Sequence, residues 1–355
     1  MQPTRPRAGT RRLAALVVII GFVVAGCAGG GDHGSSPGAA TPVPSTTGAG
    51  PATTTSSAAS TSATTAPATA PTTPGGKPQQ FEPALPIAIQ EAAAASVGNL
   101  LYVVGGYDSS RNSSATVFVF DGTSWHRGPP LPIAVNHPGA AAIGGDVYVA
   151  GGFTPGGATN RVFVLTAGNA NWRELAPMHQ PRGALALISL GGRLYAIGGR
   201  DGSVQIGATE AYDPTVATWS ALTPMPSPRN HVGGYVDGAL ACVAGGRTPA
   251  TSAAVDCLDP ATSTWQRRAT LPTSTSGAAA GVINGVTIVA GGEPADETHL
   301  VGVVQTLRQG VWAASAMLIP RHGAAFALYR GRLWACGGAT TPGFHATNSC
   351  TSLGE

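Results

Sequence analysis

The sequence predicts an all-β fold, a six-bladed β-propeller of four-stranded antiparallel blades whose ring is closed by an N-terminal strand. Pairs of glycines begin at residues 105, 151, 198, 245, 291 and 337, which places them 46 or 47 residues apart. A tryptophan follows each of the first five pairs after 19 or 20 residues. Short apolar runs separated by turn residues fill each repeat. A fixed period of this size indicates a repeat architecture, and short strands without helical periodicity indicate propeller blades.

One repeat shows the expected order of strands. Residues 183–190 form an apolar run, residues 193–198 and 208–213 are the expected second and third strands, and residues 218–223 carry Trp219. A glycine has no Cβ, so a neighbouring backbone can approach it closely and a positive φ is allowed. A tryptophan can bury roughly 150–250 Å² between neighbouring blades. The glycine pairs and the tryptophans therefore have a packing role in every blade.

The repeat resembles the kelch repeat, in which a glycine pair ends the second strand and a tyrosine precedes a tryptophan, as Tyr212 and Trp219 do here. The resemblance covers most of residues 79–355. The tyrosine position is occupied by other residues in four repeats, namely Phe120, Leu165, Leu258 and Gln305. The resemblance implies a propeller that binds partners on its loop-rich face.

The sixth repeat provides only three strands, so its outer strand must come from another part of the chain. Residues 79–85 precede the first repeat, and Leu85-Pro86 matches Leu131-Pro132 and Leu271-Pro272, which follow tryptophan strands. We expect residues 79–85 to complete the last blade, with Phe81 taking the role of the tryptophan from a position two residues displaced on the same face of the strand. Closing the ring in this way removes an exposed sheet edge.

The first 78 residues differ in composition from the repeats. Residues 1–27 have a basic start and an apolar run, Leu13–Ala25, which is short for a membrane span and typical of a signal peptide. The run ends in Val-Ala-Gly-Cys27, which resembles a bacterial lipobox and implies a lipid on Cys27. Residues 28–78 are rich in Ala, Thr, Ser and Pro and are expected to form a disordered tether. The predicted location is the outer face of the bacterial cytoplasmic membrane, in the cell envelope.

Charge and cysteine content argue against nucleic-acid binding and metal binding. The formal net charge is +3, but without the four arginines of the signal peptide 16 basic residues face 17 acidic ones. The repeats therefore have no basic footprint for nucleic acid. Four cysteines lie in the repeats, and their places in adjacent strands predict the disulfides Cys242–Cys257 and Cys336–Cys350, with free buried thiols as the alternative. Neither pair has metal-site spacing, so no metal and no cofactor are predicted.

The candidate binding residues lie where each blade's second strand ends and where the next inner strand begins. Because strands alternate in direction, both kinds of loop share one face of the ring. The arginines at 182, 229 and 321 occupy equivalent positions. They suit recognition of a carboxylate or sugar, or alternatively hydrogen bonds to backbone carbonyls between blades. The predicted ligand-binding residues are Arg182, Arg229, Arg321, His137, His231, His322, Arg200, Arg247, Glu91 and Glu293.

These features favour a monomeric, non-catalytic scaffold of the cell envelope that binds a protein or a glycan. The alternative is a sugar-processing enzyme, since a sialic-acid mutarotase shares the six-bladed architecture and Glu91 or Glu293 could move a proton beside an arginine. Copper chemistry like that of galactose oxidase would need a set of tyrosines beside His137, His231 and His322, which the sequence does not provide.

Overall fold

The structure, a computed structural model, describes residues 79–355. The predicted signal peptide, the lipidation of Cys27 and the tether lie outside the described residues. Within residues 79–355 the regular elements are all β-strands, and no helix there is long and apolar enough to cross a membrane. The prediction of an all-β fold is confirmed.

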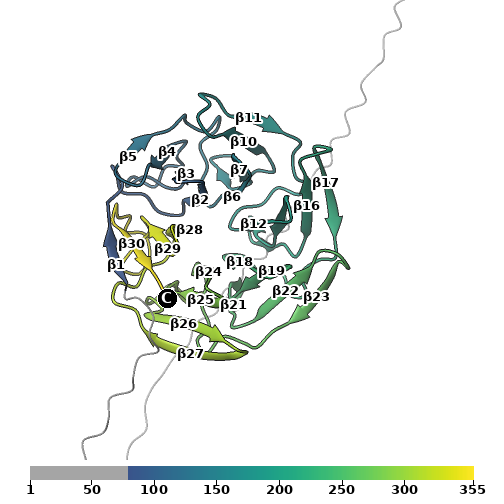
Figure 1. Ribbon diagram of the computed structural model, residues 1–355, viewed down its shortest axis with the longest axis vertical. Coiled ribbons are helices and arrows are strands. Elements are labelled where there is room, and N and C mark those ends of the chain that lie inside the picture. The colour runs from purple at the N-terminus through teal and green to yellow at the C-terminus, as the bar shows by residue number, and fades with distance from the viewer. Residues whose placement is uncertain (1–78) are drawn as a thin grey trace, which may run out of the picture. The chain divides into compact units, whose positions relative to one another are not determined.

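Six antiparallel sheets of four strands surround a central axis (Figure 1). In each sheet the first strand lies nearest the axis and the last lies outermost. The first three blades comprise β2 (Ala93–Val97), β3 (Leu100–Val104), β4 (Val117–Phe120) and β5 (Trp125–Arg127); β6 (Gly139–Ile143), β7 (Asp146–Ala150), β10 (Val162–Thr166) and β11 (Arg173–Leu175); and β12 (Ala186–Leu190), β13 (Arg193–Ile197), β16 (Thr209–Asp213) and β17 (Thr218–Leu222).

The remaining blades follow the same order, and three short hairpins extend the loops between second and third strands. The hairpins are β8–β9 (Phe153–Thr154, Gly157–Ala158), β14–β15 (Arg200–Asp201, Val204–Gln205) and β20–β21 (Arg247–Thr248, Ala250–Thr251). The blades are β18 (Gly233–Asp237), β19 (Leu240–Ala244), β22 (Val255–Asp259) and β23 (Thr264–Arg267); β24 (Ala279–Ile283), β25 (Val286–Ala290), β26 (Val303–Arg308) and β27 (Val311–Ala316); and β28 (Ala325–Tyr329), β29 (Arg332–Cys336), β30 (Cys350–Leu353) and β1 (Gln80–Glu82).

The glycine pairs join each blade to its neighbour. All twelve glycines have positive φ. A Cβ on Gly105 would lie 2.8 Å from the Val135 carbonyl oxygen, so only glycine allows this approach. The second glycine of every pair donates its N–H to a carbonyl of the next blade at 2.8–2.9 Å. The six accepting residues are Val135, Arg182, Arg229, Thr275, Arg321 and Ile89.

The tryptophans make a second repeated contact between blades. In the five tryptophans that follow glycine pairs, the indole Nε1 donates to a backbone carbonyl of the preceding blade at 2.8–3.0 Å, as Trp219 does to Ala176. The acceptor is four residues beyond the preceding tryptophan position. Trp125 donates to Pro83, which makes Gln79 the residue in the tryptophan position of the closing strand.

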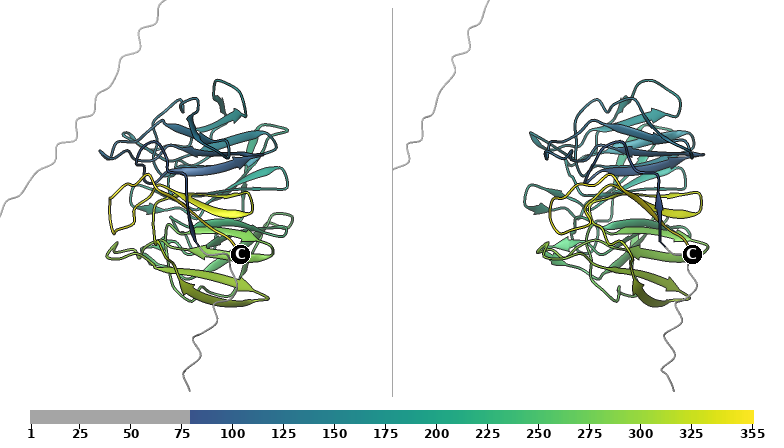
Figure 2. Two further views of the ribbon diagram at one scale, coloured as in Figure 1. Left: turned by 60° about the vertical axis from the view of Figure 1, so that its left-hand side comes forward. Right: turned by 90° about the vertical axis from the view of Figure 1, so that its left-hand side faces the viewer.

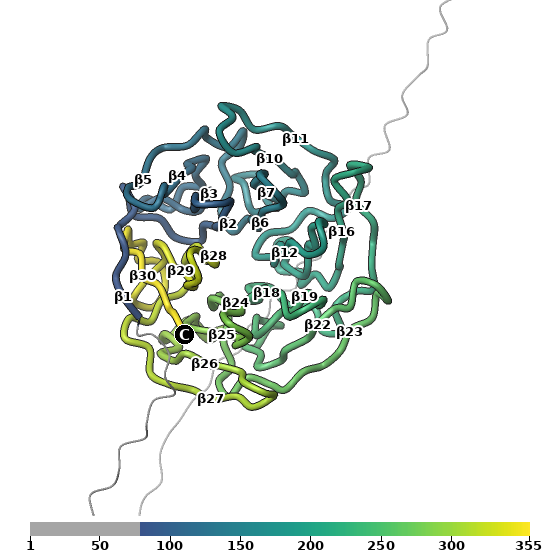
Figure 3. The backbone as a smooth tube through the Cα atoms, viewed as in Figure 1, coloured from purple at the N-terminus to yellow at the C-terminus, as the bar shows by residue number. Residues whose placement is uncertain are grey.

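The predicted closure is confirmed, but the predicted role of Phe81 is wrong. Strand β1 pairs antiparallel with β30 and completes the last blade. The two strands lie side by side in Figure 3, and Figure 2 shows the dark blue N-terminal segment against the yellow C-terminal blade. Phe81 is 71% exposed, because its place in the register lies two residues past the tryptophan position. Gln79 occupies that position, and its carboxamide both accepts from and donates to the backbone of Ile319 at 2.8 and 3.1 Å.

Both predicted disulfides are present within blades. Cys242 in β19 pairs directly with Cys257 in β22, and Cys336 in β29 pairs directly with Cys350 in β30. All four cysteines are buried. Each bond therefore links the second and third strands of one blade, as the repeat positions predicted.

Candidate functional site

A cavity of about 430 Å³ opens on the face where the long loops gather, and residues from all six blades line it. We call it the mouth cavity. Its walls combine charged, amide, imidazole and aromatic side chains, which include Tyr107, Arg200, Arg247, Glu293, His322 and Phe344. A narrower cavity of about 200 Å³ continues along the axis and is lined mostly by small residues such as Ala92, Gly139 and Gly234.

Short bridges fix the walls of the mouth cavity. In every blade the residue after the glycine pair forms an antiparallel bridge with the residue that precedes the turn into the inner strand. Asn136 with Phe153 and Asn230 with Arg247 are two of the six such pairs. The prediction that these two kinds of loop share one face follows from the alternation of strand direction, and the bridges place them in direct contact.

A ring of six equivalent residues with left-handed backbone surrounds the axis. Their φ values lie between 52° and 64°. Neighbours are joined by backbone hydrogen bonds, such as His137 N–H to the Glu91 carbonyl at 2.8 Å and His231 N–H to the Ala184 carbonyl at 2.9 Å. The six residues are Glu91, His137, Ala184, His231, Gly277 and Gly323.

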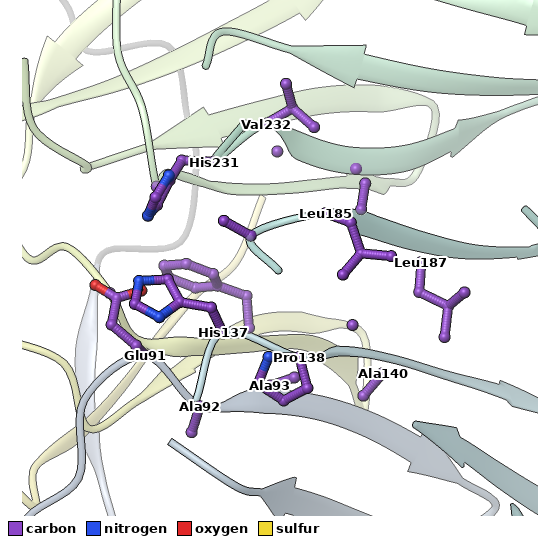
Figure 4. A pocket seen from close by; sticks show the side chains of 18 of the residues that line it. Glu91, Ala92, Ala93, His137, Pro138, Ala140, Leu185, Leu187, His231 and Val232 are labelled. Carbon is purple, nitrogen blue, oxygen red and sulfur yellow. The ribbon is translucent and has the colours of Figure 1, made fainter. Parts of the chain in front are cut away.

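Three members of this ring bring their side chains together at the floor of the mouth cavity. One ligand-capable atom each of Glu91, His137 and His231 lies within 4.8 Å of the others. Glu91 Oε2 is 3.2 Å from His137 Nε2, and the imidazole rings of His137 and His231 meet edge to face with centroids 5.1 Å apart. Figure 4 shows the Glu91 carboxylate beside His137, with His231 facing them from the other side.

The two histidines are held by equivalent asparagines. Asn136 Nδ2 donates to Ser113 Oγ at 2.8 Å and to the Phe153 carbonyl at 3.1 Å, so its Oδ1 faces His137 Nδ1 at 2.6 Å. An amide oxygen only accepts, which makes Nδ1 of His137 the protonated nitrogen. Asn230 holds Nδ1 of His231 in the same way. The Nε2 atoms are therefore the nitrogens left to face the axis.

Burial determines the charge of these histidines. Desolvation lowers the pKa of His137, opposed by the charge of Glu91, and the positive charges of Arg200 and Arg247 lower it further. Desolvation also holds the pKa of His231 well below its usual value, assisted by the charges of His137 and Arg247. Both rings are thus favoured in the neutral form at neutral pH.

The opposite wall holds an ion-pair network. Arg247 donates to Glu293 at 2.6 Å and to Glu297 at 2.7 Å, and His322 Nδ1 lies 3.1 Å from Glu293. Burial lowers the pKa of His322, but the hydrogen bond and charge of Glu293 outweigh it, so that the net shift is upward. The charge of Arg247 is therefore balanced within the protein.

Two other arginines of this face lie over aromatic rings. The guanidinium of Arg200 is 4.7 Å from the ring centroid of Phe153 and donates to the Gly202 carbonyl at 2.8 Å. Arg111 lies 4.6 Å from the ring centroid of Phe344. The aromatic face attracts each cation and orients its planar group without a carboxylate at these contacts.

The three equivalent arginines do not line the mouth cavity. Arg182, Arg229 and Arg321 are fully buried. Arg229 pairs with Asp256 at 2.8 Å, and Arg182 pairs with Glu210 and the Ala208 carbonyl. Arg321 donates to the carbonyls of Gly337 and Ser349 at 2.6 and 2.9 Å. Of the two roles that the sequence left open, these contacts match the structural one, because no guanidinium atom is accessible to a ligand.

The other seven predicted residues meet at one site. Glu91, His137, His231, His322, Arg200, Arg247 and Glu293 all line the mouth cavity. The predictions omitted Arg111, Phe344 and the role of the two asparagines. The repeated Asn-His dipeptide at 136–137 and 230–231 is the sequence signal that could have revealed the asparagines. Phe344 lies in a loop without a counterpart in the repeat, so no periodic signal marks it.

Comparison with known proteins supports this fold. Residues 91–292 match the family described as the KLHDC2/KLHL20/DRC7 Kelch-repeats domain. Kelch-like protein 33 of Homo sapiens is 36% identical over 77 residues, which are 21% of this chain and 14% of that protein. Beta-scruin of Limulus polyphemus is 34% identical over 92 residues, 26% of this chain and 10% of that protein. The chain thus spans a small part of these relatives.

A solved structure shares the architecture more completely. The structure of YjhT superposes with a TM-score of 0.66 over 75% of this chain and 95% of that one. Sequence identity in this comparison is 17%, so the similarity concerns the fold.

Proposed function

Because this chain belongs to the kelch-repeat family of β-propellers, whose members are typically protein-binding scaffolds, we propose that it binds a protein partner at the mouth cavity. The single observation that carries the proposal is the composition of this cavity. Tyr107, Phe344 and Arg200 line the cavity. Arg111 lies over the ring of Phe344, and Arg200 lies over the ring of Phe153. Aromatic residues and arginine are the side chains that dominate protein interfaces.

The charges of the rim favour an acidic segment of the partner. Arg247 is paired with two carboxylates, whereas the described contacts of Arg200 are a carbonyl oxygen and an aromatic ring. A guanidinium held over an aromatic ring keeps its edge N–H groups directed outward, where a carboxylate can accept two hydrogen bonds. Such a pair is pre-organised, which lowers the entropy lost on binding.

Binding to peptides of defined charge tests the proposal. The purified chain is screened against a panel of acidic peptides and against the same peptides with Glu and Asp replaced by Lys. We expect acidic members to bind and Arg111→Ala/Arg200→Ala to weaken binding by about tenfold or more, since a pair of this kind contributes about 1.5–3 kcal/mol.

A matched control keeps the result specific. Arg193→Ala removes an exposed arginine of β13 that is paired with Asp213, far from the mouth, and should leave peptide binding unchanged. Equal binding of acidic and basic peptides, or equal losses in the control and in the double variant, would reject the mouth as a recognition site. If the chain binds envelope glycans and none of the peptides, the partner is a glycan and the proposal of a protein partner is rejected.

We further propose that the chain acts in the cell envelope as a lipoprotein anchored through Cys27, on the basis of the signal-peptide and lipobox patterns alone. Metabolic labelling with a fatty acid should mark the native chain and not Cys27→Ser. An unlabelled native chain in a membrane-free fraction contradicts the anchor and leaves the binding proposal untouched.

A further inference from the structure

We propose that Glu91, His137 and His231 form a binding site for one divalent transition-metal ion of the Zn²⁺ class at the floor of the mouth cavity. The three side chains come from three different blades and meet next to the axis. Two imidazole nitrogens and one carboxylate are a ligand set that zinc uses where a fourth position stays open.

The separations of the ligand atoms suit such an ion. Zinc bonds of about 2.0–2.1 Å in a tetrahedral arrangement require ligand atoms about 3.3 Å apart. Glu91 Oε2 and His137 Nε2 are already 3.2 Å apart, and the third ligand atom lies within 4.8 Å of both. Binding of the ion would draw the third ligand atom closer to the other two.

The hydrogen bonds of the two histidines aim their lone pairs at the axis. Asn136 Oδ1 accepts from Nδ1 of His137, and Asn230 Oδ1 accepts from Nδ1 of His231. A metal-binding histidine usually donates its other ring N–H to such an acceptor, which fixes the tautomer and the direction of the ring. His137 Nε2 and Glu91 Oε2 lie 3.2 Å apart, so an ion bound beside them could contact both atoms.

Backbone conformation gives an independent indication. These three residues have φ of 57°, 52° and 53°, a region that is costly for side chains with a Cβ. The equivalent positions 184, 277 and 323 hold alanine or glycine, so the ring itself needs no polar side chain there. Strained positions that carry chemical groups where glycine would suffice are typical of functional sites.

The surroundings leave room for a fourth ligand. The site opens into the mouth cavity, where Arg200 and Arg247 also face. Glu91 supplies one negative charge and Glu293 balances Arg247, which limits the repulsion of a dication. The open position is available to water or to a carboxylate from the binding partner.

Zinc titration of the purified, untagged, chelator-treated full chain tests the site. We expect calorimetry to give one Zn²⁺ per chain, and Co²⁺ to produce visible absorption bands of a low-coordinate site. His137→Ala, His231→Ala and the isosteric Glu91→Gln should each weaken Zn²⁺ binding by more than about a hundredfold, beyond the 10–100-fold loss typical of outer-shell changes. The positioning variants Asn136→Ala and Asn230→Ala should fall within that 10–100-fold range.

The control variant is His126→Ala, which removes an exposed histidine of the outer strand β5 and should bind Zn²⁺ like the native chain. Circular dichroism and thermal denaturation without metal establish that each variant is folded. If an alanine variant does not fold, Glu91→Gln still tests the site, because it preserves the shape of the side chain. Absence of Zn²⁺ binding by the native chain would overturn the proposal. Unchanged affinity in folded variants of the three ligands would do the same.

Discussion

Closure of the ring by the N-terminal strand can be tested with two apolar residues of the same segment. Leu85 is 1% exposed and packs in the core between the first and last blades, whereas Phe81 is 71% exposed. Leu85→Ala leaves a cavity in a packed core and should cost about 2–5 kcal/mol. Phe81→Ala removes no buried contact and should change the free energy of unfolding by less than about 0.5 kcal/mol.

The difference is large enough to measure by thermal denaturation followed by circular dichroism. In a domain of this size, about 1 kcal/mol shifts Tm by roughly 2–4 °C, so Leu85→Ala should lower Tm by about 4–20 °C. Urea denaturation provides a second measurement of the same difference. Phe81→Ala serves as the matched control because it truncates a larger apolar side chain nearby.

Deletion of residues 79–86 extends the test to the whole closing segment. It removes the pairing of β1 with β30, the Gln79 contacts with Ile319 and the burial of Leu85. The combined loss approaches the whole stability of a typical domain, about 5–15 kcal/mol, so the melting temperature should fall sharply. An unchanged Tm after the deletion, or equal Tm values for Leu85→Ala and Phe81→Ala, would refute the role of this strand in closure.

Three further predictions concern stability. Arg182→Ala leaves the buried Glu210 carboxylate without its main partner and should cost about 3–5 kcal/mol in urea denaturation; a loss below 1 kcal/mol would contradict a structural role. Replacing Cys336 and Cys350 by Ser should cost about 2–4 kcal/mol, and peptide mapping of the native chain should recover this pair linked. The pKa of Asp121 is lowered to about 2 by hydrogen bonds from Ser124, His126 and Thr123, so this carboxylate stabilises the fold above pH 3.8 and the effect disappears as pH falls through 2; an NMR titration with an ordinary midpoint would contradict it.

The fold was predictable because its essential contacts use a glycine pair in all six blades and a tryptophan in five of them. A glycine in each pair donates to the next blade, and a tryptophan donates to the preceding one. Positions with one physical requirement repeat visibly, so the period, the strand order and the two disulfides followed from spacing. Closure by residues 79–85 followed from the missing strand.

The details that failed depend on register and burial, which spacing does not encode. Phe81 was assigned the role of the tryptophan from residue type, yet Gln79 fills it by forming amide hydrogen bonds instead of burying a ring. Arg182 and Arg229 lie close in sequence to mouth residues, but their side chains are fully buried and pair with Glu210 and Asp256. Partners of this kind come from other strands and are known only once the strands are assembled.

Comparing equivalent positions of the six blades distinguishes residues that the fold needs from residues that it does not need. At the position of the buried arginines, the backbone carbonyl accepts a glycine N–H in all six blades. The side chain at this position differs from blade to blade with its local partner. At the left-handed ring position the repeated contacts are again backbone hydrogen bonds, and glycine is sufficient to make them in the fifth and sixth blades. Folding therefore accounts for the ring but gives no reason for a carboxylate and two imidazoles to face one another across it. Their placement at Glu91, His137 and His231 is the feature of this propeller that the proposed metal ion would explain.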